Sequence, residues 1–186
     1  MKRTITIIII IFVSIGLGYA YEQIALNLEK RSHPLLYEEY VEKYSRDYSV
    51  PPEIIYSIIN TESAFKSDVV SIKGAVGLMQ ITPDTFDWLM NKMGENLSDG
   101  LLYDPNTNIK YGTYFLRYLH NEFDDWDIAF AAYNAGLNRV KNEWMKNPEY
   151  IKDGKIMYIP FEETRNYVKK VNNNREIYKK LYFSAQ

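Results

Sequence analysis

Hydrophobic residues recur at helical spacing along most of this chain, and the alternating pattern of a β-strand is nearly absent. The clearest apolar stripe includes Ile54, Ile55, Ile58 and Ile59 and runs up to Glu62. The pattern predicts a mainly α-helical fold. Helices are expected over residues 36–50, 52–63, 83–93, 109–121, 125–134, 138–145 and 161–181.

Turn chemistry supports these boundaries. Thr82 and Asp104 are each followed by proline, which is typical of an N-cap and the first position of a helix. Gly136 is typical of a helix end. Residues 65–81 are rich in turns and could hold a short β element, and residues 147–160 are expected to be a loop.

The N-terminus has a different composition. Lys2 and Arg3 precede an uncharged, isoleucine-rich run of 17 residues from Thr4 to Ala20, which is typical of an export signal. That length is at the short end of the roughly 17–25 residues that span a bilayer. We interpret residues 1–20 as a signal-anchor, with the remainder extracytoplasmic. A signal cleaved near Ala20, which would release the protein, is the alternative.

Residues 21–35 are expected to form a linker, because Pro34 interrupts any helix there. Residues 36–186 are then one domain, a length that supports a hydrophobic core of its own. The net charge of −2 gives no basic surface for nucleic acid.

The residue inventory excludes several chemistries. No cysteine is present, so thiol catalysis and cysteine-bound zinc are excluded. The two histidines, His33 in the linker and His120 at the polar end of a helix, give poor support for a Ser-His-Asp triad or a zinc site. The stretch from Gly74 to Gly77 lacks the Lys-Ser/Thr of a phosphate loop. We expect no metal and no cofactor.

Carboxylate chemistry remains, and Glu62 is its best candidate. Glu62 lies four residues after Ile58 and so shares a helix face with core residues. Apolar surroundings raise the pKa of a carboxyl, as a general acid needs near neutral pH. On spacing alone, a glutamate that reaches from the helix end into solvent is the more ordinary interpretation.

Three sequence blocks in order resemble the soluble lytic transglycosylases, which have a lysozyme-like catalytic domain. The blocks are Glu62-Ser63-Ala64-Phe65 with Ser71 to Pro83, Ala132-Tyr133-Asn134-Ala135-Gly136, and Ile159 to Val168. The resemblance covers about residues 40–182. It implies a lysozyme-like domain of about six to eight helices with at most a short β element. The apolar run at the N-terminus adds a hydrophobic helix before that domain. One position departs from the family, because Thr82 stands where methionine is common.

The resemblance also implies a reaction and a site. Glu62 would protonate the glycosidic oxygen between N-acetylmuramic acid and N-acetylglucosamine, then accept a proton from the muramic C6 hydroxyl, giving a 1,6-anhydro end. Ser63 would bind substrate or orient the carboxyl, with a helix-capping role as its alternative. Further site residues would be Gln80 for sugar groups, Tyr133 to hold Glu62, Asn134 beside it or shaping the turn, Glu163 in the groove floor and Tyr167 aimed at Glu62.

A hydrolytic muramidase is the alternative function, and a non-catalytic peptidoglycan-binding protein is a third. Most glycosidases need two flanking carboxylates, and Asp68 is the serious contender for a second acid. We expect peptidoglycan strands as the substrate, the membrane as a partner through the N-terminal helix, and a cell-envelope assembly as a candidate partner.

Overall fold

The computed structural model describes residues 2–184, with residues 2–6 and 8–10 described by their backbone alone. The chain divides into two compact units, residues 1–34 and residues 35–186. Each unit is described by itself.

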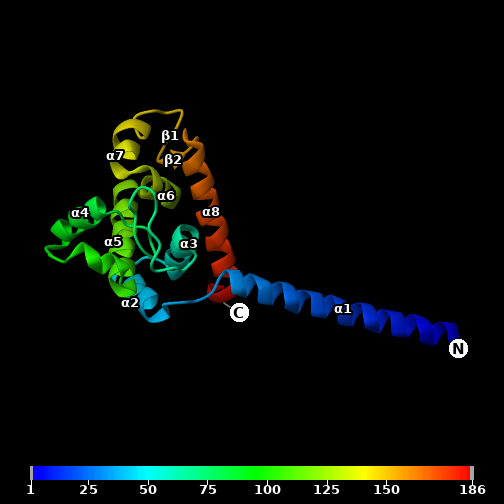
Figure 1. The fold of residues 1–186 in the computed structure, drawn as a ribbon. Coiled ribbons are helices and arrows are strands. Elements are labelled where there is room, and N and C mark those ends of the chain that lie inside the picture. Colours follow the sequence, from blue (N-terminus) through cyan, green and yellow to red (C-terminus); the bar gives the residue numbers. More distant parts are fainter. Residues whose placement is uncertain (1, 185–186) are drawn as a thin grey trace. The chain divides into compact units, whose positions relative to one another are not determined.

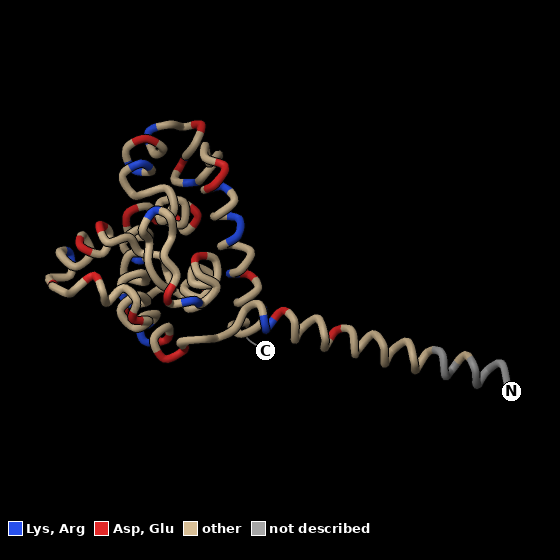
Figure 2. Tube along the Cα trace, viewed as in Figure 1, with Lys and Arg blue, Asp and Glu red and all other residues tan. Residues whose placement is uncertain are grey.

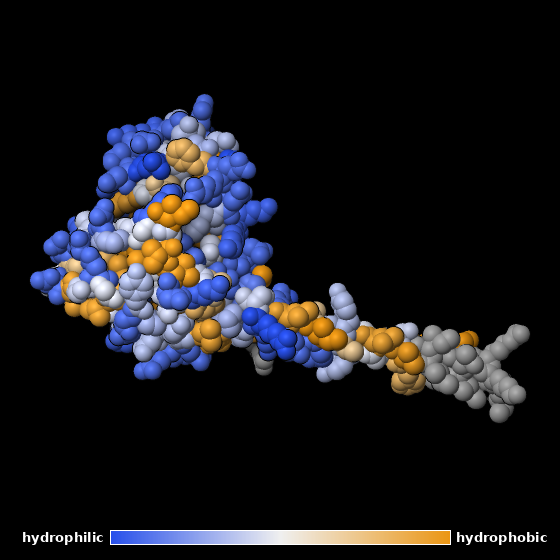
Figure 3. Space-filling view, in the orientation of Figure 1, coloured by the Kyte–Doolittle hydropathy of each residue, from blue (hydrophilic) through white to orange (hydrophobic). Residues whose placement is uncertain are grey.

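The first unit contains one long helix, α1 (Lys2–Ser32; Figure 1). The expected linker is therefore helical as far as Ser32, and the helix ends just before His33, whose helical conformation is disfavoured by Pro34. Phe12, Ile15 and Leu17 are each more than 60% exposed, and the described part of α1 carries much apolar surface in Figure 3.

The membrane prediction for residues 1–20 falls in part on side chains outside the described set. Side chains of residues 1–6 and 8–10 belong to the expected export segment and are not described. Within the part of the chain that is described, no helix meets the length and apolarity needed to cross a bilayer.

The second unit is mainly helical, which confirms the predicted fold class (Figure 1). Short 3-10 and π-helical turns lie at Asp99–Tyr103, Val140–Trp144 and Lys179–Phe183. The helices are α2 (Glu38–Tyr48), α3 (Pro52–Ser63), α4 (Pro83–Met93), α5 (Pro105–Phe123), α6 (Trp126–Ala135), α7 (Leu137–Arg139) and α8 (Glu162–Tyr178).

The predicted caps form. The Thr82 side chain accepts a hydrogen bond from the Thr85 amide at the start of α4, and Asp104 accepts one from the Thr107 amide at 2.8 Å at the start of α5. Gly136 ends α6 with a φ of 97°. Turn and cap residues therefore set these boundaries locally, as their sequence signals indicate.

The β structure lies where the sequence predicted a loop. Within the described residues, the sheet consists of β1 (Ile151–Lys152) paired antiparallel with β2 (Lys155–Ile156). The loop prediction was wrong here because Asp153 and Gly154 both have positive φ, 51° and 72°, as a two-residue hairpin turn requires. Residues 65–81, the segment that could hold a short β element, make isolated bridges at Val70–Val76 and Val76–Ile81.

Helix α3 is the centre of the core. Its isoleucines are completely buried, which confirms the predicted stripe, and its main partner is α8. In Figure 1, α3 lies between α5 and α8. Burying one such side chain contributes about 1.5–3 kcal/mol, so α3 and the glutamate near its end are firmly held.

Positive and negative residues are interspersed along the second unit (Figure 2). Exposed ion pairs join Arg46 to Glu42 and Lys141 to Glu122. A mixed surface of this kind agrees with the near-neutral net charge.

Gly112 in α5 allows the loop at Met79 to pack closely. An added Cβ at Gly112 would lie 2.8 Å from the Met79 Cβ. The Met79 amide is itself fixed by the Asn108 Oδ1 at 2.7 Å, so the loop cannot easily retreat.

Gly112→Ala should destabilise the domain by at least about 1 kcal/mol, since crowding in a packed core typically costs about 1–3 kcal/mol. Denaturant unfolding measures this free energy. Gly100→Ala is the control, because an added Cβ at Gly100 would lie 3.7 Å from its nearest neighbour, the Ser98 Oγ, which is an ordinary van der Waals contact. Equal stability of the two variants would contradict the close packing of Met79 on α5.

Candidate active site

Glu62 lies in the last turn of α3, next to the point where the chain turns away. Ala64 and Phe65 both have positive φ, 49° and 66°, which ends the helix. The Glu62 side chain lines a cavity of about 570 Å³. Its walls come from α3, the 70–82 loop, α6 and α8, and are formed by Glu62, Val70, Ser71, Ile72, Lys73, Ala75, Gln80, Thr82, Tyr133, Asn134 and Glu163.

The carboxyl of Glu62 is largely buried. Burial raises its pKa from 4.5 to about 7, while a hydrogen bond from Tyr167 and the charge of Lys170 act in the opposite direction. The Tyr167 hydroxyl donates to Glu62 Oε1 at 2.7 Å. At neutral pH both the acid and the carboxylate are therefore populated, as a group that first donates and later accepts a proton requires.

The two site tyrosines have different partners. Tyr167 holds Glu62 as predicted, but the Tyr133 hydroxyl donates to the Met79 carbonyl oxygen at 2.7 Å rather than to Glu62. Burial is the main reason that the pKa of each hydroxyl is well above 10, so both remain neutral donors. Tyr133 lies at the cavity wall next to Glu62 and fixes the loop before Gln80.

Gln80 also lines the cavity. Its backbone φ is 49°, and its side-chain Nε2 donates to the carbonyl oxygens of Val69 at 3.1 Å and Gly77 at 2.9 Å. Both amide hydrogens therefore hold the loop. Its Oε1 has no hydrogen bond to any described residue, which leaves an acceptor for a ligand.

Ser63 is buried and does not line the cavity. Its hydroxyl contacts the Leu78 carbonyl oxygen at 2.8 Å and the Ile59 carbonyl oxygen at 3.2 Å. These contacts agree with the structural alternative for Ser63, because they join the end of α3 to the 70–82 loop. They do not place its hydroxyl where a sugar would lie.

Asn134 and Glu163 lie at the cavity edge. Asn134 Oδ1 accepts from the Thr164 hydroxyl at 2.8 Å, so α6 and α8 are joined there. Glu163 is mostly exposed and lies 3.8 Å from the Lys73 ammonium across the rim. Its position is therefore at the rim of the cavity rather than in a buried floor.

The sequence did not single out Asn108, although this buried side chain organises the loop. Its Nδ2 donates to the carbonyl oxygens of Val76 and Leu102, and its Oδ1 accepts from Met79. Gly77 has a φ of 79°, and an added Cβ there would lie 2.6 Å from the Leu102 carbonyl oxygen. A polar residue among the apolar positions of α5 was the available signal.

No second carboxylate lies opposite Glu62 among the described residues that line the cavity. Asp68 is exposed and does not line the cavity, whose described carboxylates are Glu62 and the exposed Glu163. The described residues also contain no cluster of three or more His, Cys, Asp or Glu that could hold a metal ion.

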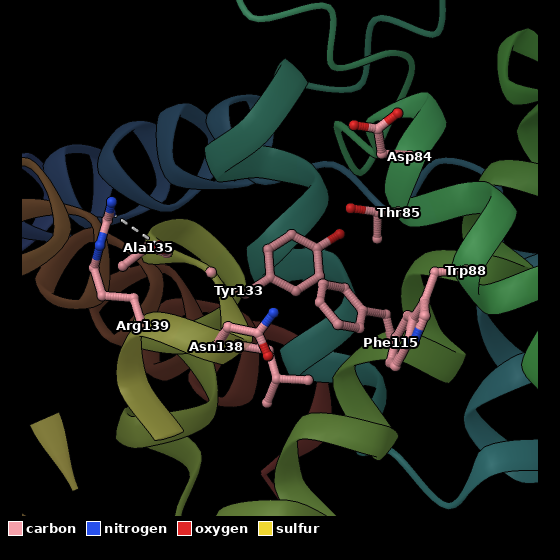
Figure 4. Close-up of a pocket in the computed structure, with 10 residues that line it drawn as sticks. Asp84, Thr85, Trp88, Phe115, Tyr133, Ala135, Asn138 and Arg139 are labelled. Atoms are coloured by element: carbon pink, nitrogen blue, oxygen red, sulfur yellow. Dashed lines mark hydrogen bonds between the residues drawn. The ribbon is translucent and has the colours of Figure 1, made fainter. Parts of the chain in front are cut away.

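An aromatic-lined cavity of about 490 Å³ adjoins the first and shares Tyr133 with it (Figure 4). The Phe115 ring lies 5.2 Å from Tyr133 and 6.0 Å from Trp88, so the three rings form a row. A third, smaller cavity of about 250 Å³ shares Lys73, Asn134 and Glu163 with the first. The joined cavities can accommodate an extended ligand.

Comparison with known proteins gives one consistent family. The model of the transglycosylase SLT domain matches residues 39–156. The soluble lytic murein transglycosylase of Escherichia coli (strain K12) is 39% identical over 150 residues, covering 78% of this chain and 23% of the relative. Membrane-bound lytic murein transglycosylase C of Actinobacillus pleuropneumoniae serotype 5b (strain L20) is 31% identical over 186 residues, covering 86% of this chain and 49% of the relative.

Comparison with solved structures leads to the same family. The 70 kDa soluble lytic transglycosylase from Escherichia coli superimposes with a TM-score of 0.74 at 36% identity, covering 82% of this chain and 25% of that one. The complex of the 70-kDa soluble lytic transglycosylase with bulgecin A gives a TM-score of 0.75 at 35% identity, covering 85% and 26%. The chain spans between about a quarter and a half of the length of these relatives.

Glu62→Gln should reveal the desolvation of the carboxyl as a pH-dependent stability difference. Because the folded pKa of about 7 exceeds 4.5, the wild type loses stability as pH rises through that window. Glutamine does not ionise and can still accept from Tyr167. We expect similar stabilities near pH 4 and a variant more stable by up to about 3 kcal/mol near pH 8.

Denaturant unfolding at both pH values measures this difference. Glu176→Gln, at an exposed position of α8, is the matched control and should show no comparable gain at the higher pH. If wild type and Glu62→Gln had the same stability near pH 8, Glu62 would not be desolvated.

Proposed function

The chain belongs to the transglycosylase SLT domain family, and on that premise we propose that residues 36–186 are the catalytic domain of a peptidoglycan lytic transglycosylase, a lyase. It would cleave the β-1,4 bond between N-acetylmuramic acid and N-acetylglucosamine. The observation that carries the proposal is the desolvated Glu62, with a pKa raised to about 7 and a hydrogen bond from Tyr167, at the wall of an extended cavity.

In the proposed reaction, protonated Glu62 donates its proton to the glycosidic oxygen. The bond from that oxygen to the muramic C1 breaks, and the N-acetylglucosamine end leaves as the alcohol. The substrate N-acetyl group stabilises the positive charge on C1. Glu62, now a carboxylate, takes the proton of the muramic C6 hydroxyl as that oxygen attacks C1. The tethered hydroxyl is favoured over water by proximity, and Glu62 recovers its proton.

The neighbouring residues suit this cycle. Tyr167 donates to Glu62 Oε1, so its hydrogen bond favours the carboxylate formed after the first proton transfer. Gln80 Oε1 and the Asn134 side chain supply polar groups for sugars at the cavity wall. Ser63 and Tyr133 are proposed to act through the loop that they hold, since their hydroxyls donate to the backbone.

The joined cavities form a continuous surface that could bind a glycan strand. The row of Trp88, Phe115 and Tyr133 presents apolar ring surface, against which sugar rings can pack. The smaller cavity, which shares Ala135 and Arg139 with the aromatic one, brings the opposite charges of Lys73 and Glu163 beside the catalytic cavity. The proposed substrate is therefore a polymer that extends beyond the Glu62 cavity into the adjoining ones.

A hydrolytic muramidase is less well supported. An inverting hydrolase needs a second carboxylate about 6.5–9.5 Å from the acid with room for water between them, and Asp68 is exposed outside the cavity. A purely binding role would have no use for a carboxyl with a pKa near neutrality. Desolvation of Glu62 therefore favours catalysis, and the lack of a facing carboxylate among the described residues of the cavity favours a reaction with one carboxylate.

The protein is proposed to act outside the cytoplasm, held at the membrane by residues 1–20. Supporting observations are the basic residues before an uncharged run, the exposed apolar side chains of α1, and the membrane-bound name of one relative. Residues 21–35 would then be a partly helical stalk, and a cell-envelope assembly remains a candidate partner.

Glu62→Gln should lower the release of soluble fragments from purified peptidoglycan by about 10²–10⁴-fold, because the neutral amide cannot donate a proton. Fragment release by the full chain, scored by chromatography, measures this. Glu176→Gln, on the exposed side of α8, should leave the rate unchanged. Undiminished release by Glu62→Gln would remove the basis for the proposed function.

Sequencing the N-terminus of the protein recovered from cells tests the anchor. A retained signal-anchor predicts a chain that keeps its first twenty residues and sediments with membranes. A mature chain that begins near Tyr21 and remains in the soluble extracytoplasmic fraction would contradict anchoring and favour secretion.

A further inference from the structure

One face of α8 holds the last turn of α3, the turn that carries Glu62. The residues on this face recur at intervals of three or four, which places them on one side of a helix. Each contacts a group in residues 60–62 of α3. They are Tyr167, Lys170, Asn174 and Tyr178.

Two of these contacts converge on the residue before the acid. The Lys170 ammonium donates to the Thr61 carbonyl oxygen at 3.1 Å, and the Asn174 amide donates to the Thr61 hydroxyl at 3.0 Å. Thr61 therefore has its backbone and its side chain held by α8. With Tyr167 on Glu62 itself, the backbone and carboxyl of the acid are fixed from the same helix.

The position of the ammonium also matters electrostatically. The last carbonyl groups of a helix lack partners within the helix and form its negative end, where a cation is favourable. The Thr61 carbonyl is in that position near the end of α3. Lys170 satisfies it and brings a positive charge close to Glu62.

Of the other groups near Glu62, Tyr167 compensates for burial more strongly than Lys170, through its hydrogen bond to the carboxyl. Tyr167 from α8 and Tyr133 from α6 are neutral, and Lys73 from the loop pairs with Glu163 at the rim. After Tyr167, Lys170 is the group that opposes the effect of burial and lowers the pKa of Glu62.

We propose that Lys170 is a positioning residue for Glu62: it fixes the last turn of α3 through the Thr61 carbonyl and holds a positive charge beside the carboxyl. This inference rests on the proposed function, in which Glu62 gives up a proton to the leaving oxygen. By favouring the carboxylate, Lys170 would promote that proton transfer. Without it, the protonated form of Glu62 would be more strongly favoured.

The test is a carbon-13 titration of the glutamate side chains in the full chain, with Glu62→Gln to identify the Glu62 resonance. Lys170→Met should raise the midpoint of Glu62 by roughly half a pH unit, since one exposed charge acts through screening solvent. Lys170→Arg should restore the midpoint of the wild type. Lys169→Met, the exposed neighbour on α8, is the matched control and should leave it unchanged.

Salt gives a second measurement that needs no variant. The Debye length falls from about 10 Å at 0.1 M to about 3 Å at 1 M, so salt should raise the Glu62 midpoint of the wild type and shrink its difference from Lys170→Met. An unchanged midpoint in a folded Lys170→Met, or the absence of any salt effect on the wild type, would overturn the proposal. If Lys170→Met does not fold, the salt titration and Lys170→Arg decide.

These outcomes are independent of the proposed activity. The titration reads the ionisation of Glu62 directly and does not require cleavage of peptidoglycan. Failure of the proposed function would appear as fragment release that persists in Glu62→Gln, whereas failure of the Lys170 proposal would appear as an unmoved midpoint.

Discussion

The site depends on the desolvation of one carboxyl group. Glu62 lies in the last turn of a helix whose isoleucines are completely buried, so its side chain lies against the core, and burial raises its pKa to about 7. A shift of that size corresponds to about 3 kcal/mol between its two protonation states. Tyr167 and Lys170 oppose the shift without cancelling it. The result is a group poised to donate and accept a proton near neutral pH.

The rest of the domain fixes this group relative to a binding surface. Helix α8 holds the end of α3 through Glu62 and Thr61, while Asn108 in α5 holds the loop that carries Gln80. Tyr133 joins α6 to the same loop through the Met79 carbonyl. The acid and the cavity wall are thus tied to helices rather than to free loops, which is the arrangement that an accurately positioned catalytic group requires.

Local signals in the sequence predicted the helix caps, the buried stripe of α3 and the face that carries Glu62, because each depends on residues a few positions apart. The hairpin at 151–156 was missed, although Asp153-Gly154 is a strong turn signal. The hydrogen-bond partners of Tyr133 and Lys170 could not be predicted from such local signals. The Tyr133 hydroxyl reaches a carbonyl 54 residues away, and Lys170 reaches one 109 residues away, so the final packing decides both.

The proposed reaction differs from ordinary hydrolysis in its nucleophile, which is the C6 hydroxyl of the substrate and not water. The most direct measurement is digestion of purified peptidoglycan in oxygen-18-labelled water, followed by mass spectrometry of the soluble fragments. The account predicts 1,6-anhydromuramic ends that carry no label. Reducing muramic ends that carry one labelled oxygen would show that water attacks C1 and would contradict it.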